Sequence, residues 1–576
     1  MSRQAPLALL TAALLGGCAA PPSTVMSHDH GDMPPGMMHN MAMPPMPQVY
    51  MGQADKAGAP VFKNLGTHHH KITTDVAETQ AYFDQGLRLL VNFNHAEAIR
   101  SFREAARLDP ECAMCWWGVA FALGPNINLP MQDDAYAPAW EALGKARALA
   151  PKAAAEEQAW IAALATRYAP DATTPRPPLD AAFAEAMGKL AAKYPDDLDV
   201  AQFYAEAMMD TQPWDYWEAD GTTPKGHGAE IVRVLEGILA REPNHAGALH
   251  LYIHAVEAST TPERAEAAAD RLATLMPDAG HIVHMPSHIY YRVGRYRDAA
   301  AANEKAALVD ETYIAACKAQ GFYPLGYYGH NIHFLWTSAE MDGRYETAIT
   351  AARRLVKAVD AVNVARQIGQ SELFVFTPLV TYVRFGKWDE VLAEPLPPVD
   401  LALDTVVAHY ARAFAYANTG DQAGAKRERD LLAGVQKAPG LAKLASQMVP
   451  APAMAELALL LVDGEIARTK GDLATAVRIF QQASAHERAL PYTEPPYWHQ
   501  PVSHLLGAVL LEAHRFADAE AVYRDSLKVY RRDGWALRGL TLALEGQGKT
   551  REAAKVAADQ RAAWQLADVV LVSSRF

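Results

Sequence analysis

The sequence predicts an all-α protein, a solenoid of about ten helix-turn-helix units. From residue 79 onward the pattern is almost wholly helical, with alanine-rich segments and few strand signals. Small and aromatic residues recur with a period of roughly 34 residues, which is typical of stacked helix pairs. A proline closes the second helix of successive units, at Pro110, Pro151, Pro195, Pro243 and Pro277. Half of the 576 residues are hydrophobic, which is enough for such an array to bury a continuous core between its units.

The N-terminus, residues 1–17, has the pattern of a secretion signal. Arg3 precedes an apolar stretch, Leu7–Leu15, that is too short to cross a bilayer. The following Gly16-Gly17-Cys18 completes a sequence that resembles the bacterial lipobox, which implies cleavage before Cys18 and its lipidation. Ordinary cleavage without a lipid, or a chance match, remains the alternative. By the same resemblance, Ala19 favours the outer membrane, so we expect a lipid-anchored protein of the bacterial cell envelope that faces the periplasm.

A segment rich in methionine and histidine, residues 18–60, follows the lipobox. Prolines interrupt any helical pattern in it, so the sequence predicts a disordered tether. Its soft thioether and imidazole ligands suit copper, especially Cu(I), although a spacer that binds nothing is the plain alternative. The ligands proposed here are Met33, Met37, Met38, His39, Met41 and Met43.

A short lead-in, residues 61–78, connects the tether to the first repeat. It holds the run His68-His69-His70, which either binds a metal weakly or simply precedes the first helix.

The first repeat unit carries a full set of anchor residues. They are Tyr82, Gly86, Ala98, Phe102, Ala105 and Pro110. This order resembles the tetratricopeptide repeat, in which small residues let two helices approach, aromatic rings fill the gap and proline ends the second helix. The inter-helix turn recurs at Gly294-Arg295-Tyr296, Gly343-Arg344-Tyr345 and Gly471-Asp472-Leu473, so we expect the solenoid to cover residues 79–576.

Several longer phrases also resemble a group of bacterial secreted repeat proteins. Examples are "HLYIHAVEAS" at 250–259 and "HIVHMPSHIYYRVGRY" at 281–296. The resemblance implies a fold rather than an activity. In tetratricopeptide repeats the first helix of each unit lines a concave groove, which implies a protein or peptide partner for this chain.

Seven of the 21 histidines lie between residues 250 and 333. They are His250, His254, His281, His284, His288, His330 and His333. Aligned on the repeat, they fall at places 2, 5 and 9 of the first helix in three successive units. Steps of three and four residues return to one face of a helix, so the pattern predicts a histidine-rich groove.

Histidines three or four residues apart on a helix can share one metal ion. The pairs would be His250 with His254, His284 with His288, and His330 with His333, and copper or zinc is the expected metal. Glu257 lies one turn beyond His254 and is the candidate ligand, orienting group or general base. The opposing interpretation is that duplication of a repeat copies buried histidines that only pack.

Three functions follow from these patterns. The leading one is an envelope protein that binds a protein, a peptide or a small ligand in the histidine-rich groove, with a link to copper or transition-metal handling. The alternatives are a hydrolase-like metal enzyme with its site between His250 and His333, and a plain assembly scaffold. A net charge of −13 argues against nucleic acid, which needs a basic surface.

The cysteine pair Cys112 and Cys115 has a C-x-x-C spacing outside any βαβ setting. A disulfide, two packed thiols and a soft-metal site are all open.

Overall fold

The computed structural model describes residues 48–50, 52–447 and 449–576. The predicted signal peptide, Cys18, His39 and the tether methionines Met33, Met37, Met38, Met41 and Met43 lie outside the described residues. The described chain is all-α, and within it only two isolated β-bridges occur, Asn126 with Leu129 and Trp217 with Pro224. Among these residues, no helix combines the length and the apolar character that a membrane crossing needs.

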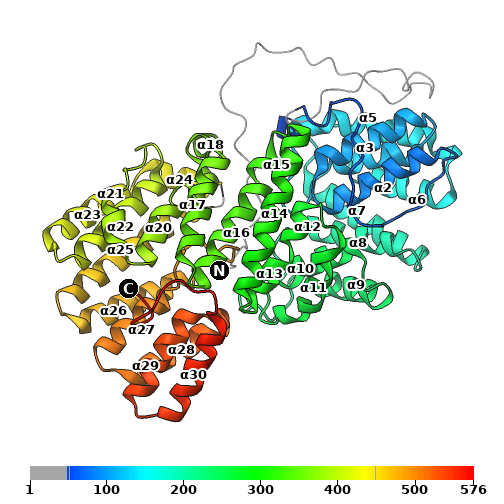
Figure 1. Ribbon diagram of the computed structural model, residues 1–576. Coiled ribbons are helices and arrows are strands. Elements are labelled where there is room, and N and C mark those ends of the chain that lie inside the picture. Colours follow the sequence, from blue (N-terminus) through cyan, green and yellow to red (C-terminus); the bar gives the residue numbers. More distant parts are fainter. Residues whose placement is uncertain (1–47, 51, 448) are drawn as a thin grey trace. The chain divides into compact units, whose positions relative to one another are not determined.

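The chain divides into two compact bodies, each of which is described separately. The N-terminal body holds the described residues up to Pro286 together with 305–328, and the C-terminal body holds 287–304 and 329–576. The helices of the N-terminal body, coloured blue to green in Figure 1, are α2 (Ala77–Val91), α3 (His95–Leu108), α4 (Ala113–Ala122), α5 (Tyr136–Leu149), α6 (Ala155–Ala165), α7 (Arg176–Lys193), α8 (Leu198–Thr211), α9 (Gly228–Arg241), α10 (Ala246–Val256), α11 (Glu266–Leu275), α12 (Gly280–His284) and α15 (Phe322–Leu325).

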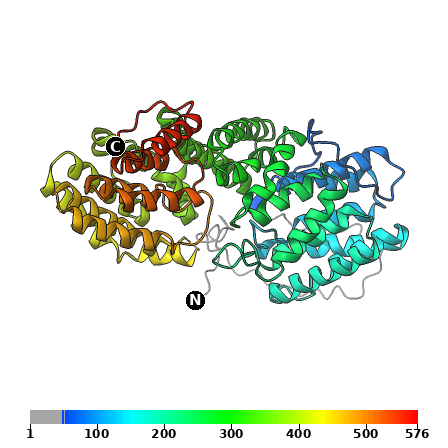
Figure 2. The same ribbon diagram turned by 90° about the horizontal axis from the view of Figure 1, so that it is seen from below.

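The C-terminal body continues the array of helix pairs. Its helices are α17 (Tyr345–Ala358), α18 (Ala361–Gln367), α19 (Glu372–Val375), α20 (Thr377–Arg384), α21 (Trp388–Ala393), α22 (Ala402–Asn418), α23 (Gln422–Val435), α24 (Pro439–Ser446), α25 (Ala451–Thr469), α26 (Leu473–Glu487), α27 (Val502–Glu512), α28 (Phe516–Val529), α29 (Gly534–Gly546) and α30 (Thr550–Ala563). Three helices have residues in both bodies: α13 (Pro286–Arg292), α14 (Tyr296–Cys317) and α16 (Tyr327–Met341). Within each body, consecutive helices lie side by side, as with α2 and α3 or α22 and α23 (Figure 2).

The turn between paired helices confirms the predicted repeat. Gly294, Gly343 and Gly471 all have positive φ, of 79°, 71° and 82°. This left-handed conformation reverses the chain after a helix and is free of steric cost only for glycine. In the first pair, α2 and α3, the same place is held by Phe93 with φ 51°.

The anchor residues of the first unit pack as the repeat pattern predicts. Ala98, Phe102 and Ala105 are completely buried. The Phe102 ring lies so close to α2 that a Cβ built on Gly86 would come within 2.4 Å of it. A side chain at Gly86 would therefore push α2 away from α3, which explains why this place needs glycine.

The predicted tether ends earlier than residue 60. Val49, Tyr50 and Ala54 are buried, and the Arg100 guanidinium donates to the carbonyl oxygen of Gly58 at 2.8 Å. Residues 48–50 and 52–60 therefore pack on the first helix pair. Their sequence resembles the preceding segment in its Pro, Met and Gly content, and composition does not reveal that a few apolar side chains dock onto a neighbouring surface.

The first helix of the unit that carries His281, His284 and His288 is interrupted. It forms as α12 and α13, separated at Met285, with Pro286 at the start of the second helix. Proline has no N–H and its ring collides with the preceding turn, so the helix breaks there. The chain also passes from the N-terminal to the C-terminal body between Pro286 and Ser287.

Cys112 and Cys115 form a disulfide at the start of α4. Both residues are completely buried. Of the three possibilities left open by their spacing, the structure contains the disulfide.

Candidate functional site

The N-terminal body brings together His250, His254 and His281, which we call the histidine centre. His250 and His254 lie one turn apart on α10, and His281 lies on α12. At the start of α12, Gly280 lies close to Asp310: a Cβ built on it would come within 1.8 Å of Oδ1 of Asp310. The Ile282 amide also donates to Oδ1 of Asn92 at 3.2 Å, which fixes the start of α12 against the end of α2.

The three rings converge on one point. Nε2 of His250 and Nε2 of His281 are 3.1 Å apart. One ring nitrogen of each of the three histidines lies within 4.8 Å of those of the other two, and each residue is at most 2% exposed. Two imidazole nitrogens on one tetrahedral metal, each at about 2.0–2.1 Å, are about 3.3 Å apart. A hydrogen bond joins the two nitrogens, and their separation is close to what a shared metal ion requires.

Glu257 orients the second histidine of the centre. Nδ1 of His254 donates to Oε1 of Glu257 at 3.3 Å, and this carboxyl group is 1% exposed. A hydrogen bond from Nδ1 to a carboxylate leaves Nε2 with its lone pair, which is the tautomer that binds metals. Of the three roles predicted for Glu257, its place in the structure fits that of the orienting group.

Aromatic rings enclose the histidine centre. The Phe93 ring lies 4.6 Å from the ring of His250 and 5.1 Å from that of His281. The Trp214 ring meets the ring of His254 edge-on at 4.8 Å, and the Tyr327 ring is 4.8 Å from that of His281. This wall excludes water, and burial raises the pKa of the Tyr327 hydroxyl.

Two of these wall residues have strained backbones. Phe93 and Trp214 have φ of 51° and 63°. For a bulky side chain this conformation costs about 1–2 kcal/mol, and such strain gathers at functional sites. Nε1 of Trp214 donates to the carbonyl oxygen of Ile127 at 2.9 Å, so the loop between α4 and α5 holds the ring in place.

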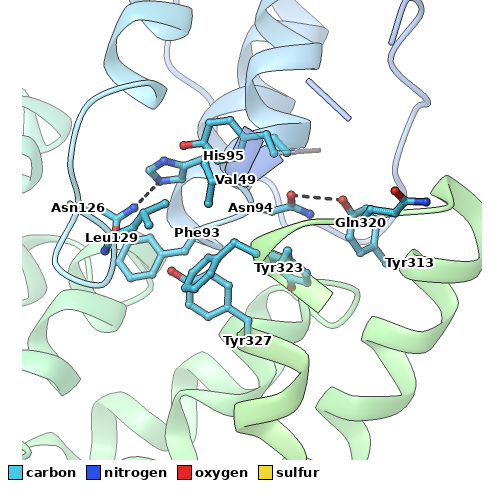
Figure 3. Close-up of a pocket in the computed structure, with 13 residues that line it drawn as sticks. Val49, Phe93, Asn94, His95, Asn126, Leu129, Tyr313, Gln320, Tyr323 and Tyr327 are labelled. Atoms are coloured by element: carbon cyan, nitrogen blue, oxygen red, sulfur yellow. Dashed lines mark hydrogen bonds between the residues drawn. The ribbon is translucent and has the colours of Figure 1, made fainter. Parts of the chain in front are cut away.

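Phe93 and Tyr327 also line a small cavity (Figure 3). Its volume is about 20 Å³, room for about one water molecule. His95 borders it; the Nδ1 of this ring donates to the carbonyl oxygen of Ala122 at 2.9 Å, and burial lowers its pKa to about 4. A neutral, bonded His95 and a cavity of this size describe a closed wall rather than a substrate pocket.

The other predicted histidines have different surroundings. His284 is buried in the N-terminal body, and its ring stacks on that of His281 at 5.8 Å. In the C-terminal body, Nδ1 of His288 donates to Oε2 of Glu494 at 3.1 Å, and the ring of His288 is 5.7 Å from that of His330.

His330 and His333, which were predicted to share a metal ion, have different neighbours. His330 packs against Phe334, whereas His333 stacks on Trp336 at 5.1 Å and meets the ring of Phe374 edge-on. Burial lowers the pKa of His333 to about 3, and among the described residues it belongs to no cluster of potential metal ligands. It is a packing histidine, as the duplication argument allows.

The wall of the histidine centre was only partly visible in the sequence. Trp214 stands in an inserted aromatic loop, but Phe93 and Tyr327 had no motif of their own. The repeat register could have singled out Phe93, because it stands where Gly294 and Gly343 stand in other turns, and a bulky residue at that place is unusual.

Comparisons with known proteins give distant similarities to solved structures. No protein-family model and no curated protein sequence matches the chain. Among solved structures, the human IFIT1 dimer with m7Gppp-AAAA has 11% identity and a TM-score of 0.27, with 86% of this chain and 92% of that chain covered. Yeast Tom70 has 10% identity and a TM-score of 0.26, with 84% and 92% covered. The P58(IPK) TPR domain has 12% identity and a TM-score of 0.22, with 84% and 99% covered. At these scores the likeness carries no argument about function.

Proposed function

We propose that the protein is a transition-metal-binding helical-repeat protein, with the metal held by His250, His254 and His281. The observation that supports this is the convergence of three buried imidazoles from two helices on one point. Imidazole ligands suit zinc, copper, iron and nickel, and three of them leave one coordination position of a tetrahedral ion for a further ligand. Glu257 supplies the carboxylate partner that such ligands usually have.

The enclosed surroundings favour holding a metal over turning over a substrate. The adjoining cavity accommodates about one water molecule, and Glu257 is already engaged by His254. A hydrolytic enzyme needs a base that faces a bound substrate. We therefore place metal storage, transfer or structural use ahead of the hydrolase alternative.

The test measures metal binding by the full-length chain. Purified protein is stripped with a chelator, reloaded with Zn²⁺, Co²⁺ or Cu²⁺, and assayed for bound metal. His254→Ala should lose one equivalent, and Glu257→Gln should weaken the affinity by about 10–100-fold while the fold persists. His227→Ala is the control because His227 is an exposed histidine of the same body.

Two results would contradict the proposal. One is wild-type metal content in a folded His254→Ala protein. The other is an affinity that Glu257→Gln does not change. Co²⁺ absorption adds a readout that loss of folding does not imitate, because nitrogen ligands around a tetrahedral ion give characteristic visible bands.

We further propose that copper is the metal handled and that the protein is anchored to the bacterial outer membrane through Cys18. Both depend on the N-terminal sequence alone. A full-length variant with the tether ligands replaced by alanine separates the two metal sites: it should lose Cu(I) binding by the tether and keep the metal of the histidine centre.

A protein or peptide partner for the repeat surface belongs to the same proposal, since stacked helix pairs present extended surfaces that suit such partners.

A further inference from the structure

A second group of histidines surrounds one aspartate in the N-terminal body. Asp199 lies in the first turn of α8, His245 stands immediately before α10, and His68 lies in the segment before α2. All three border a cavity of about 680 Å³ whose rim also carries Asp197 and Glu242. This volume is within the size range of ligand-binding pockets, whereas the cavity beside the histidine centre has room for about one water molecule.

Three potential ligand atoms meet at Asp199. Nε2 of His68 is 3.1 Å from Oδ1 of Asp199, and Nε2 of His245 is 3.3 Å from the same oxygen. The three ligand atoms lie within 4.8 Å of one another. Nε2 of His245 is buried and makes no well-formed hydrogen bond to any described residue. Two imidazole nitrogens and one carboxylate oxygen around a point are the ligand set of many zinc sites.

His70 holds the carboxyl group of Asp199 in position. Nδ1 of His70 donates to Oδ2 of Asp199 at 2.8 Å, which leaves Oδ1 facing His68 and His245. Asp197 caps α8 by accepting from the amide of Asp199 at 2.9 Å, which fixes the backbone below the carboxyl group. The oxygen that would bind a metal is therefore oriented from both sides.

His245 must change its tautomer to bind an ion. Its Nδ1 accepts from the amide of Ala248 at 3.2 Å, so the neutral ring carries its proton on Nε2. Binding at Nε2 moves that proton to Nδ1 through solvent and gives up this one helix cap. A single neutral hydrogen bond is a modest loss against three metal–ligand bonds.

We propose that His68, His245 and Asp199 form a second metal site, which binds a divalent transition-metal ion with an open coordination position toward the cavity. The acidic rim offsets the added positive charge, since the ion exceeds the charge of Asp199 by one. His68 is 26% exposed, so solvent and chelators reach this site. The site is independent of the histidine centre, and neither proposal depends on the other.

Zn²⁺ binding to the full-length chain tests the proposal, with the metal alone as the probe. His68→Ala should lower the affinity of one equivalent by at least about 100-fold, because one of three ligands is lost. His69→Ala is the matched control: His69 is the next residue, its side chain is 56% exposed, and it pairs with Asp84 instead. It should change the affinity less than about 3-fold. Both substitutions are repeated in a full-length His254→Ala chain whose tether ligands are also replaced by alanine, in which only this site should remain.

Exchange rates give a second measurement on the wild-type protein. Zn²⁺ at the open site should pass to a chelator at least about 10-fold faster than Zn²⁺ at the enclosed histidine centre, and His68→Ala should abolish only the fast phase. Equal binding by His68→Ala and His69→Ala overturns the proposal, as does a folded His254→Ala chain that binds no Zn²⁺. If His254→Ala does not fold, the proposal is tested by His68→Ala in the otherwise wild-type chain, which should lose one equivalent of Zn²⁺.

Discussion

Phe93 offers a sharp test of the strained turn beside the histidine centre. Phe93→Ala and Phe93→Gly both remove a ring that is 5% exposed and contacts His250 and His281. Deleting a buried Phe costs about 3–5 kcal/mol of stability, and this loss is common to the two variants. They differ in how well they tolerate a φ of 51° and in the conformational entropy that they lose on folding.

The expected difference between the two variants can be worked out from the backbone. Alanine retains the left-handed strain of about 1–2 kcal/mol, from which glycine is free. Glycine in turn loses about 0.5–1 kcal/mol more conformational entropy on folding. The glycine variant should therefore be more stable by about 0.5–1 kcal/mol, which reverses the usual order.

Thermal unfolding of the full-length variants measures this difference. For a body of this size, about 1 kcal/mol corresponds to roughly 2–4 °C in Tm. Lys189, an exposed residue of α7, is the control, since Lys189→Ala should be more stable than Lys189→Gly by about 1 kcal/mol. If Phe93→Ala proves more stable than Phe93→Gly, the strain at this turn does not have the role we assign to it.

Three further predictions concern other parts of the two bodies. Burial lowers the pKa of His333 to about 3. Below about pH 6.5, this imidazole is therefore protonated in the unfolded chain while it stays neutral in the folded chain. This contribution to stability is full above pH 7 and declines by about 1.4 kcal/mol per pH unit as the pH falls toward 3. Urea unfolding at pH 5 and 7 should therefore show that the stability of His333→Phe depends less on pH than that of the wild type. An unchanged pH dependence of stability in the variant refutes the prediction. Gly280→Ala should displace α12, destabilise the N-terminal body by about 1–3 kcal/mol and reduce the metal content at the histidine centre. Calorimetry measures the stability and metal analysis the metal content, and a variant in which both are unchanged contradicts the prediction. Saturating metal at about 100 times Kd should stabilise the body that holds the site by about 2.7 kcal/mol, and a Tm that does not respond to metal would exclude tight binding to the folded state alone.

The sequence predicted the fold more completely than the site. Repeat spacing located the turns at Gly294 and Gly343 and the packing of Phe102 against Gly86, because each depends on local geometry that recurs. It also predicted that His250 and His254 share a face of one helix. It placed His281 in the same groove.

What the sequence could not show depends on contacts between distant segments. The contact between His281 and His250 joins two helices whose approach depends on residues outside the repeat pattern, among them Gly280, which lies close to Asp310. Repeat register assigned His333 and His254 similar roles, yet the first packs on Trp336 and the second meets Glu257. The cluster at Asp199 combines α8, the start of α10 and the segment before α2, and no periodicity connects them.

The path of the chain through the two bodies sets a time order for building the enclosed centre. Residues 305–328 return to the N-terminal body after the chain has entered the C-terminal one. Until residues 305–328 have returned, the three histidines lack Tyr327 in their wall. Under the proposed function, a metal ion therefore enters a partly folded chain more easily than the finished body, in whichever compartment the chain folds. Uptake during folding and release from the mature protein would then be governed by different barriers.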